Sequence, residues 1–301
     1  MLQASRSAQS LDHIRLVTNG NPLTWGNLLF PTAPAVNQYS AVWEEASQPP
    51  CYARVVHQVG EPNGQLTFLV AEPESDSGAV TCLLEDLIRH SGTWGARYLL
   101  CDLPTDSAFL PAFRRADFNI WARQRLFRFI GTLPRPLSMA YAWRPWNSGD
   151  IKAMLSLYRN LVPKLFQSIE PLTRKAMLGL VLTDQKNNLL GYADLEYGMR
   201  GIWVLPFLLP EANDPQILLD MLASLPATFQ RPVYICARSY QPWMEDVVSH
   251  LPVESGGEQA LMVRYLVLQE KVPQAVQRQV FETNPSDGSV PVAQAHHNGN
   301  S

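Results

Sequence analysis

The stretch from Gln65 to Phe129 constrains the fold of this chain more than any other part of its sequence. It predicts, in order, a strand, a loop, a helix, a strand, a short helix and a strand, at residues 65–71, 72–77, 78–92, 96–103, 107–116 and 119–129. Apolar residues at positions i, i+3, i+4, i+7 and i+8 mark the first helix: Val80, Leu83, Leu84, Leu87 and Ile88. A strand, a crossover helix and a strand form neighbouring parallel strands, so an α/β fold is expected.

The second half of the chain repeats this plan. A strand at 139–143 and a helix beginning at Asp150 lead into a hairpin of strands 177–182 and 189–197 and a third strand at 201–209. A helix around 218–225, a strand at 232–237, a helix at 242–250 and a strand at 260–268 follow. Leu84 and Leu219 hold the same place in their helices, 135 positions apart, and Tyr98 and Tyr234 correspond at 136. These matching spacings predict an internal duplication.

The domain boundaries follow from this repeat and from composition. We expect a loose N-terminus at 1–11, a first domain at 12–130, a proline-containing linker at 131–138, a second domain at 139–269 and a disordered tail at 270–301. Asp12–Val17 is expected to be the first strand, and Asn21–Tyr39 to be irregular. Tyr52–Val59, the turn Glu61–Gly64 and the strand from Gln65 predict a hairpin.

Composition excludes several classes of protein. The net charge of −3 argues against non-specific nucleic-acid binding. No run of 18 apolar residues occurs, so no membrane span is expected, and the N-terminus lacks the apolar core of a signal peptide. The four cysteines are far apart and form no C-x-x-C pair. They favour free thiols in a reducing cytoplasm.

The element order, and the phrase ending Phe113-Arg114-Arg115-Ala116-Asp117-Phe118, resembles the GNAT N-acetyltransferase family. The resemblance is one of pattern and spacing and covers about half of the chain. It implies an α/β fold of two tandem GNAT-like (acyl-CoA N-acyltransferase) domains, each with a mixed, mostly antiparallel sheet flanked by helices. It also implies acetyl-coenzyme A (acetyl-CoA) as co-substrate.

The resemblance implies a coenzyme site only in the first domain. The carbonyl of the acetyl group would be held near Val70 and Ala71, and the pyrophosphate would lie on N–H groups at the start of a helix. The family's loop is matched by 75–80, where Gly78 fits its first glycine, while Ser75, Asp76 and Val80 depart from it. The expected cofactor-binding residues are therefore Val70, Ala71, Ser77, Gly78, Ala79 and Val80. Alternatively, Ser77 simply caps the helix.

Other family positions do not carry the expected chemistry. In the second domain, loop 210–215 has no glycine, and Pro215 lacks an N–H group. Phe113 and Val248 stand where many members have a tyrosine general acid, and neither can donate a proton. No catalytic residue is identified. Asp106 stands where many members have asparagine, and a helix-capping role is the alternative we favour.

The remaining polar candidates favour structural roles. His57 is a possible base, but a structural histidine with a bonding partner is favoured. Glu196 and Tyr197 would face either a cleft or, as we favour, solvent at a strand end. The arginines of strand 119–129 favour sheet surface or a contact between domains. No metal site is expected, since His296 and His297 alone do not form one.

Two functions remain open. The first is acetyl-CoA-dependent N-acyl transfer to an unknown amine, either a small molecule or a protein N-terminus or lysine. The second is a catalytically inactive GNAT-fold binding or scaffold protein. Asp76, Val80, Phe113 and the glycine-free second loop favour the second. The sequence does not indicate the oligomeric state.

Overall fold

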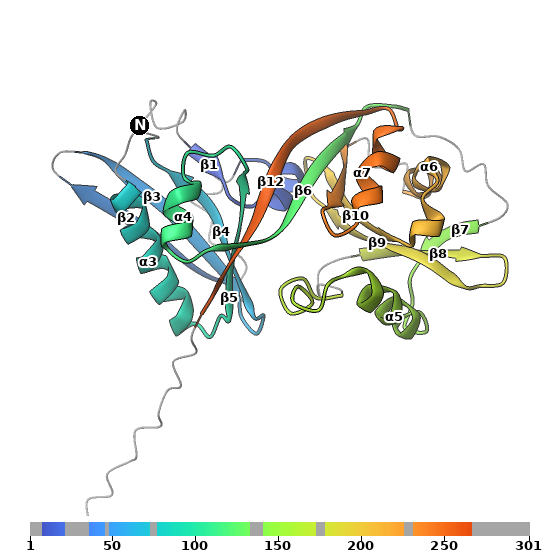
Figure 1. Cartoon of the computed structure of the whole chain (residues 1–301), viewed down its shortest axis with the longest axis horizontal. Coiled ribbons are helices and arrows are strands. Elements are labelled where there is room, and N and C mark those ends of the chain that lie inside the picture. The colour runs from blue at the N-terminus through green and yellow to red at the C-terminus, as the bar shows by residue number, and fades with distance from the viewer. Residues whose placement is uncertain are drawn as a thin grey trace, which may run out of the picture. The chain divides into compact units, whose positions relative to one another are not determined.

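The computed structural model shows one large sheet with helices packed against it (Figure 1). The structure describes residues 8–21, 36–45, 48–72, 77–132, 141–172, 178–225 and 231–266. Contacts group the chain into one unit at Met1–Gln269 and a second at Glu270–Ser301, and the second lies outside the described residues. The disordered tail therefore remains a prediction.

The sheet has 12 strands in the order β2-β3-β4-β5-β12-β6-β11-β10-β9-β8-β7, with β1 paired to β4. Two neighbouring pairs are parallel, β4 with β5 and β10 with β11, and the other pairs are antiparallel. The strands are β1 (Ala8–Ser10), β2 (Val36–Glu45), β3 (Gln48–Gln58), β4 (Asn63–Val70), β5 (Tyr98–Pro104), β6 (Asn119–Phe129), β7 (Tyr141–Pro145), β8 (Leu178–Asp184), β9 (Leu189–Tyr197), β10 (Ile202–Leu208), β11 (Val233–Arg238) and β12 (Val253–Tyr265).

The helices follow the predicted positions, apart from the first and from the short 3-10 helix η1, which falls in a predicted loop. They are α1 (His13–Asn19), α3 (Ser77–Thr93), α4 (Leu110–Arg115), α5 (Ile151–Leu161), η1 (Pro210–Ala212), α6 (Pro215–Ser224) and α7 (Pro242–Ser249). In α3 the predicted apolar stripe faces the core, and Leu84 is fully buried. Gly95, with a φ of 83°, follows the helix and allows the left-handed turn into β5.

The N-terminal segment differs from the prediction. Asp12–Val17 was expected to be a strand, but His13–Asn19 form helix α1. The Asp12 side chain accepts a hydrogen bond from Arg15 N and caps the helix. Ile14 and Val17, three residues apart, both pack against one core cluster, which is the spacing of a helix. The strand lies just before, at Ala8–Ser10, within the segment expected to be loose.

The two halves exchange their last strands. β12, from the end of the second half, lies between β5 and β6 of the first half. Likewise, β6 lies between β12 and β11 of the second half. Figure 1 shows the two long strands side by side at the middle of the sheet. Both halves therefore belong to one continuous sheet, and the domain boundary at 131–138 remains a prediction, since 133–140 lie outside the described residues.

The arginines of β6 serve this junction. Arg125 pairs with Glu245 of α7, while Arg123 and Arg128 pair with glutamates of β12. The preferred interpretation of these arginines, a sheet surface or contact between the halves, agrees with these ion pairs. Their exposure means that each contributes little to stability.

Candidate functional site

An opening, which we call the first slot, lies where β4 and β5 diverge, beside the expected coenzyme-binding residues Val70 and Ala71. These strands pair only at their beginnings, from Asn63 opposite Tyr98 to Gln65 opposite Leu100. Beyond this point the strands separate, and the facing edges of β4 and β5 no longer bond to each other. Val70 ends β4 beside this opening, and Ala71 follows it. The opening would expose backbone groups of both strands to an extended ligand.

The chain's own N-terminal segment fills this opening. β1 pairs antiparallel with β4, with Ala8 opposite Val70. Leu11 then bridges the two strands, because its N–H donates to Thr67 O at 3.0 Å and its carbonyl accepts from Asp102 N at 2.9 Å. Its side chain is fully buried. On its other edge Val70 pairs with Tyr52 of β3, so both backbone edges of β4 are occupied there.

The predicted phosphate-binding segment is only partly described. Residues 73–76, which include Ser75 and Asp76, lie outside the described part of the chain. Ser77 begins α3, Gly78 is half-buried in its first turn, and Ala79 and Val80 belong to the apolar core. The valine side chain thus points into the core. The role of these residues in phosphate binding remains a prediction.

The positions of the family's general acid are apolar and buried. Phe113 is fully buried, and its ring centroid lies 5.3 Å from that of Phe118 in an edge-on arrangement. Val248 of α7 is equally buried. Neither supplies a proton. Asp106 does not cap α4, which starts at Leu110; instead Phe109 N donates to the hydroxyl of Ser107. The capping role expected for this aspartate is therefore wrong.

The corresponding opening in the second half is also filled. β10 and β11 pair only from Ile202 to Val204, opposite Val233 to Ile235. Past this point Gln241, which is 1% exposed, turns its amide towards β10. It accepts from Leu208 N at 3.2 Å and donates to Pro206 O at 3.0 Å. One amide side chain thus satisfies the backbone groups that a ligand would otherwise use.

Loop 210–215, the counterpart of the expected phosphate loop in the second half, leads into helix α6. Asp214 accepts from Gln216 N at 2.8 Å, and Pro215 is the first residue of α6. The aspartate therefore caps the helix with its own carboxylate. Because that carboxylate already lies on the first free N–H group, an anion has no reason to bind there.

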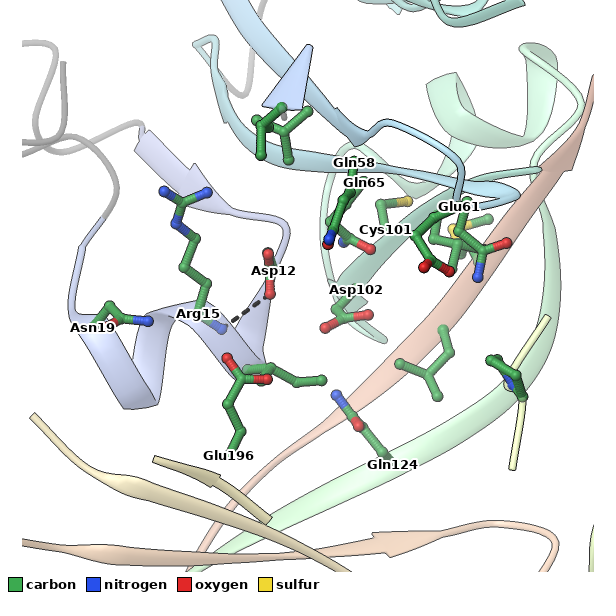
Figure 2. Close-up of a pocket in the computed structure, with 18 of the residues that line it drawn as sticks. Asp12, Arg15, Asn19, Gln58, Glu61, Gln65, Cys101, Asp102, Gln124 and Glu196 are labelled. Carbon is green, nitrogen blue, oxygen red and sulfur yellow. Dashed lines mark hydrogen bonds between the residues drawn. The ribbon is translucent and has the colours of Figure 1, made fainter. Parts of the chain in front are cut away.

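An open cleft lies beside the first slot, with a volume of about 870 Å³. It is bordered by α1, by the ends of β3, β4 and β5, by β6 and by the β9–β10 turn. Figure 2 shows Asp102, Glu196 and Gln124 around one space, each on a different strand. Its polar lining residues are Asp12, Arg15, Asn19, Gln58, Glu61, Asn63, Gln65, Asp102, Gln124, Glu196 and Arg238.

Carboxylates dominate the charge of this cleft. Four of the lining residues are acidic: Asp12, Glu61, Asp102 and Glu196. Of the two arginines, Arg238 is already paired with Glu170 at 2.7 Å. His13 adds no positive charge at neutral pH, because burial lowers its pKa to about 4, although neighbouring Asp12 acts in the opposite direction. Among the lining residues that the structure describes, acidic groups thus outnumber basic ones.

Arg238 anchors the floor of the cleft in a buried network. Its side chain is 4% exposed, bonds to Glu170 and Gln124, and lies over the ring of Trp121. Tyr240 donates to the other oxygen of Glu170 at 2.7 Å. Burial is the largest effect and disfavours the guanidinium charge, but Glu170 together with Cys236, Tyr240 and Asp102 outweighs burial and raises the pKa of Arg238 above its usual range. The arginine is thus a fixed, compensated charge.

Several lining residues were placed differently by the sequence. Glu196 and Tyr197 line the cleft, so the interpretation that we favoured, a solvated strand end, was wrong. His57 is buried and its Nε2 contacts Glu61 O at 2.8 Å, as favoured for a structural histidine. Cys101 lines the cleft as well, but burial raises the pKa of its thiol well above the usual range. This thiol is therefore unreactive near neutral pH.

No sequence pattern indicated a functional role for Asp102, Gln124, Glu170, Arg238 or Gln241. In the described part of the chain, no group of three or more histidine, cysteine, aspartate or glutamate residues is arranged to hold a metal ion. No described helix combines the length and apolar character needed to cross a membrane.

No family model matches this chain, and no curated protein matches it in sequence. Solved structures do. A functionally unknown conserved protein from Staphylococcus epidermidis is 13% identical, with a TM-score of 0.52 over 76% of this chain and 95% of that one. A GCN5-related N-acetyltransferase from Sphaerobacter thermophilus is 11% identical, with a TM-score of 0.48 over 71% and 76%. A tandem GNAT protein from the clavulanic acid biosynthesis pathway is 13% identical, with a TM-score of 0.47 over 78% and 84%.

At these identities the similarity concerns the fold. The fold class expected from the sequence is confirmed: the chain is α/β, with a mixed, mostly antiparallel sheet flanked by helices, and the Staphylococcus epidermidis protein shares this fold. The assignment of its two halves to tandem GNAT-like domains remains a prediction. Function has to be argued from the two filled slots and the open cleft.

Proposed function

We propose that this chain is a GNAT-fold binding protein that, in the conformation described, does not take an acyl group from coenzyme A. The observation that carries the proposal is Leu11, whose backbone bridges Thr67 and Asp102 in the first slot. An acyl-pantetheine arm and this segment cannot occupy the same space. The second slot offers no substitute, since Gln241 already bonds to Leu208 N and Pro206 O.

The ligand that we propose for the cleft is a small cationic amine. Its ammonium group would lie among the carboxylates of Asp102, Glu196 and Glu61, which come from different elements and whose oxygens can accept hydrogen bonds from an ammonium group. The amides of Gln58, Gln65 and other lining residues supply further hydrogen-bonding groups around it. A cleft of about 870 Å³ has the size of small-molecule sites.

Calorimetric titration of the full chain tests this proposal, with spermidine as the cationic probe and acetyl-CoA as the competing hypothesis. We expect heat with spermidine and none with micromolar acetyl-CoA. Asp102→Asn keeps the oxygen that accepts from His13 N but removes the charge, and should weaken spermidine binding about fivefold. Glu72→Gln, an exposed carboxylate outside the cleft, is the matched control and should bind as the wild type does.

Two results would contradict the proposal. If spermidine produces no heat, or if Asp102→Asn and Glu72→Gln weaken it equally, the cleft is not the amine site. If micromolar acetyl-CoA binds to the wild type and an amine is acetylated, the first slot is open in solution and the protein is an enzyme.

Acetyl-CoA-dependent N-acyl transfer remains the second candidate, because the cleft adjoins the slot. Gln65 and Asp102 line the cleft, and both also bond to the N-terminal segment, at Leu11 and His13. A small amine, or a protein N-terminus or lysine, bound in the cleft would therefore lie next to a thioester in the slot. Its nitrogen would attack the thioester carbonyl, the C–S bond would break so that coenzyme A leaves as its thiolate, and the amine proton would pass to water.

This second candidate requires acetyl-CoA to enter the first slot. Acyl transfer would be measured directly as the release of free coenzyme A thiol in the presence of spermidine. Turnover that depends on both substrates would favour the enzyme. Thiol release that does not require an amine would not favour the enzyme, since water alone can hydrolyse a thioester.

A further inference from the structure

The N-terminal strand is attached to the slot by few contacts. β1 makes three register pairs with β4, and each of its residues is partly exposed. The hydroxyl of Ser107 donates to the Gln9 side chain at 3.1 Å, and Leu11 supplies the only fully buried side chain of residues 8–11. Leu11 adds backbone hydrogen bonds to Thr67 and Asp102, and its carbonyl also accepts from the Gln65 side chain. A segment held by a three-residue pairing, these bonds at one residue and one apolar anchor belongs to the less stable part of a fold.

The helix that follows is attached much more firmly. At the end of α1, Thr18 O accepts from Arg200 N at 2.8 Å, and the helix lies against the β9–β10 turn. A Cβ atom on Gly198 would lie only 2.1 Å from Thr18 O, which shows how closely the two backbones approach. Asp12, where the strand becomes the helix, is therefore a natural hinge: residues 8–11 can leave while α1 stays.

We propose that Ala8–Leu11 form a displaceable strand that competes with the pantetheine arm of acyl-coenzyme A for the slot between β4 and β5. This inference rests on the proposed function, because it explains the closed slot, and it adds that the closure is reversible. The pantetheine arm is an extended chain with two amide groups. It can therefore replace the backbone N–H and carbonyl of Leu11 at Thr67 O and Asp102 N.

Competition between the strand and the coenzyme predicts how the apparent affinity for the coenzyme depends on the fraction of open slots. If the slot is open in only a small fraction of molecules, the apparent dissociation constant is the intrinsic one divided by that fraction. Weakening the strand raises this fraction and must tighten coenzyme binding without any new contact. The affinity of ligands for the cleft need not change. The carboxylates that line the cleft lie outside the strand, and of these only Asp12 lies at the hinge.

Leu11→Asp in the full chain is the first test, because it places a charge at a fully buried position and expels the strand. We expect acetyl-CoA and pantetheine to bind at least tenfold more tightly than to the wild type, measured by calorimetry. Ala8→Ser, at a partly exposed position of the same strand, is the matched control and should not change either affinity. Adenosine 3′,5′-bisphosphate, which lacks pantetheine, should also bind equally to all three proteins.

Two results would overturn the inference. The first is a folded Leu11→Asp variant, judged by its circular dichroism and melting transition, that binds neither acetyl-CoA nor pantetheine. The second is an equal gain for adenosine 3′,5′-bisphosphate, which would place the new affinity outside the slot. Spermidine titration of the wild type separates the two proposals, because an absence of heat would contradict amine binding and leave strand competition unaffected.

A second measurement needs no variant and covers the case in which Leu11→Asp does not fold. Hydrogen exchange of the wild type is followed by mass spectrometry with and without millimolar acetyl-CoA. We expect the peptide that contains residues 8–11 to exchange faster with the coenzyme, while β4 and β5 exchange no faster. Unchanged or slower exchange of residues 8–11 would show that coenzyme does not displace the strand.

Discussion

Gln124 donates a hydrogen bond to Gln259 at 2.6 Å, and the two residues lie opposite each other in the pair formed by β6 and β12. They are 135 positions apart, the spacing that separates corresponding helices in the two halves. Each is thus the counterpart of the other, and the bond lies where the two repeats meet. Repeats that met only through a linker would not place equivalent residues in contact.

This contact explains why the halves share one sheet. Each half lacks a strand between its fifth strand and its last one, and the last strand of the other half fills that position. Neither half buries its sheet edge alone, since an unpaired strand edge is open to association. We therefore infer that the halves fold cooperatively, although the sequence repeat suggests two independent units.

Leu84 provides the most direct check of the core. It is fully buried in the stripe of α3, so Leu84→Ala should lower the free energy of unfolding by about 2–5 kcal/mol. Urea denaturation measures this change. Glu85→Ala, on the exposed side of the same helix, is the control and should cost less than about 0.5 kcal/mol. Equal effects would mean that the helix face is misassigned.

The ion pair of Glu170 and Arg238 should differ sharply from the exposed pairs of β6. Both side chains are at most 5% exposed, and Glu170→Ala leaves a buried guanidinium without its carboxylate. We expect a loss of about 3–5 kcal/mol in the free energy of unfolding. Glu254→Ala breaks the pair with Arg128, in which both side chains are at least 50% exposed, and should cost no more than about 1 kcal/mol.

A small loss for Glu170→Ala would contradict the burial of the network. In that case water must reach Arg238 from the cleft. Measuring the free energy of unfolding of both variants in low and high salt distinguishes a buried network from one that water reaches, because salt screens exposed pairs far more than buried ones.

The sequence predicted the elements whose periodicity is long, and it missed the segments that fill the slots. The stripe of α3 extends over several turns, so its face and position followed directly. Ala8–Ser10 is too short for any periodic pattern, and its pairing depends on β4, about 60 positions away. Gln241 is a single amide at the start of α7, and nothing local indicates that it closes a slot.

The cleft was missed for a related reason. Glu196 lies at the end of β9, where a charged residue usually faces water, and it lines the cleft only because α1 packs against the β9–β10 turn. Asp12–Val17 was expected to be a strand, so the sequence placed no helix there. Once α1 is known, Asp12 and Asp102 fall on the same cleft.

Gly198 tests the close contact that holds α1 against the β9–β10 turn. Gly198→Ala would put a methyl group 2.1 Å from Thr18 O, so α1 has to move away from the β9–β10 turn. We expect a loss of at least about 1–3 kcal/mol in unfolding free energy and weaker spermidine binding. Gly92→Ala is the control, because it lies in α3 with no atom within 4 Å of the new Cβ. It should be neutral or stabilise by about 0.5–1 kcal/mol.

His13 makes stability depend on pH. Burial lowers its pKa from 6.5 to about 4 in the folded chain, despite the opposing charge of Asp12. Between these values the unfolded chain binds more protons than the folded chain, so stability must fall as pH decreases. The contribution of this residue is present above about pH 6.5 and is lost progressively towards pH 4. It amounts to at most about 3 kcal/mol.

His13→Gln removes the titrating group, and urea denaturation from pH 7 to pH 4 measures the result. The variant should lose less stability over this range than the wild type, by up to about 3 kcal/mol. Other groups titrate in both proteins, so only the difference between the two curves is informative. His250→Gln, at an exposed position, is the control and should follow the wild-type curve. Parallel curves for His13→Gln and the wild type would mean that His13 is reached by water when folded. The segment around it, which joins the slot to the cleft, would then be more open than its packing indicates.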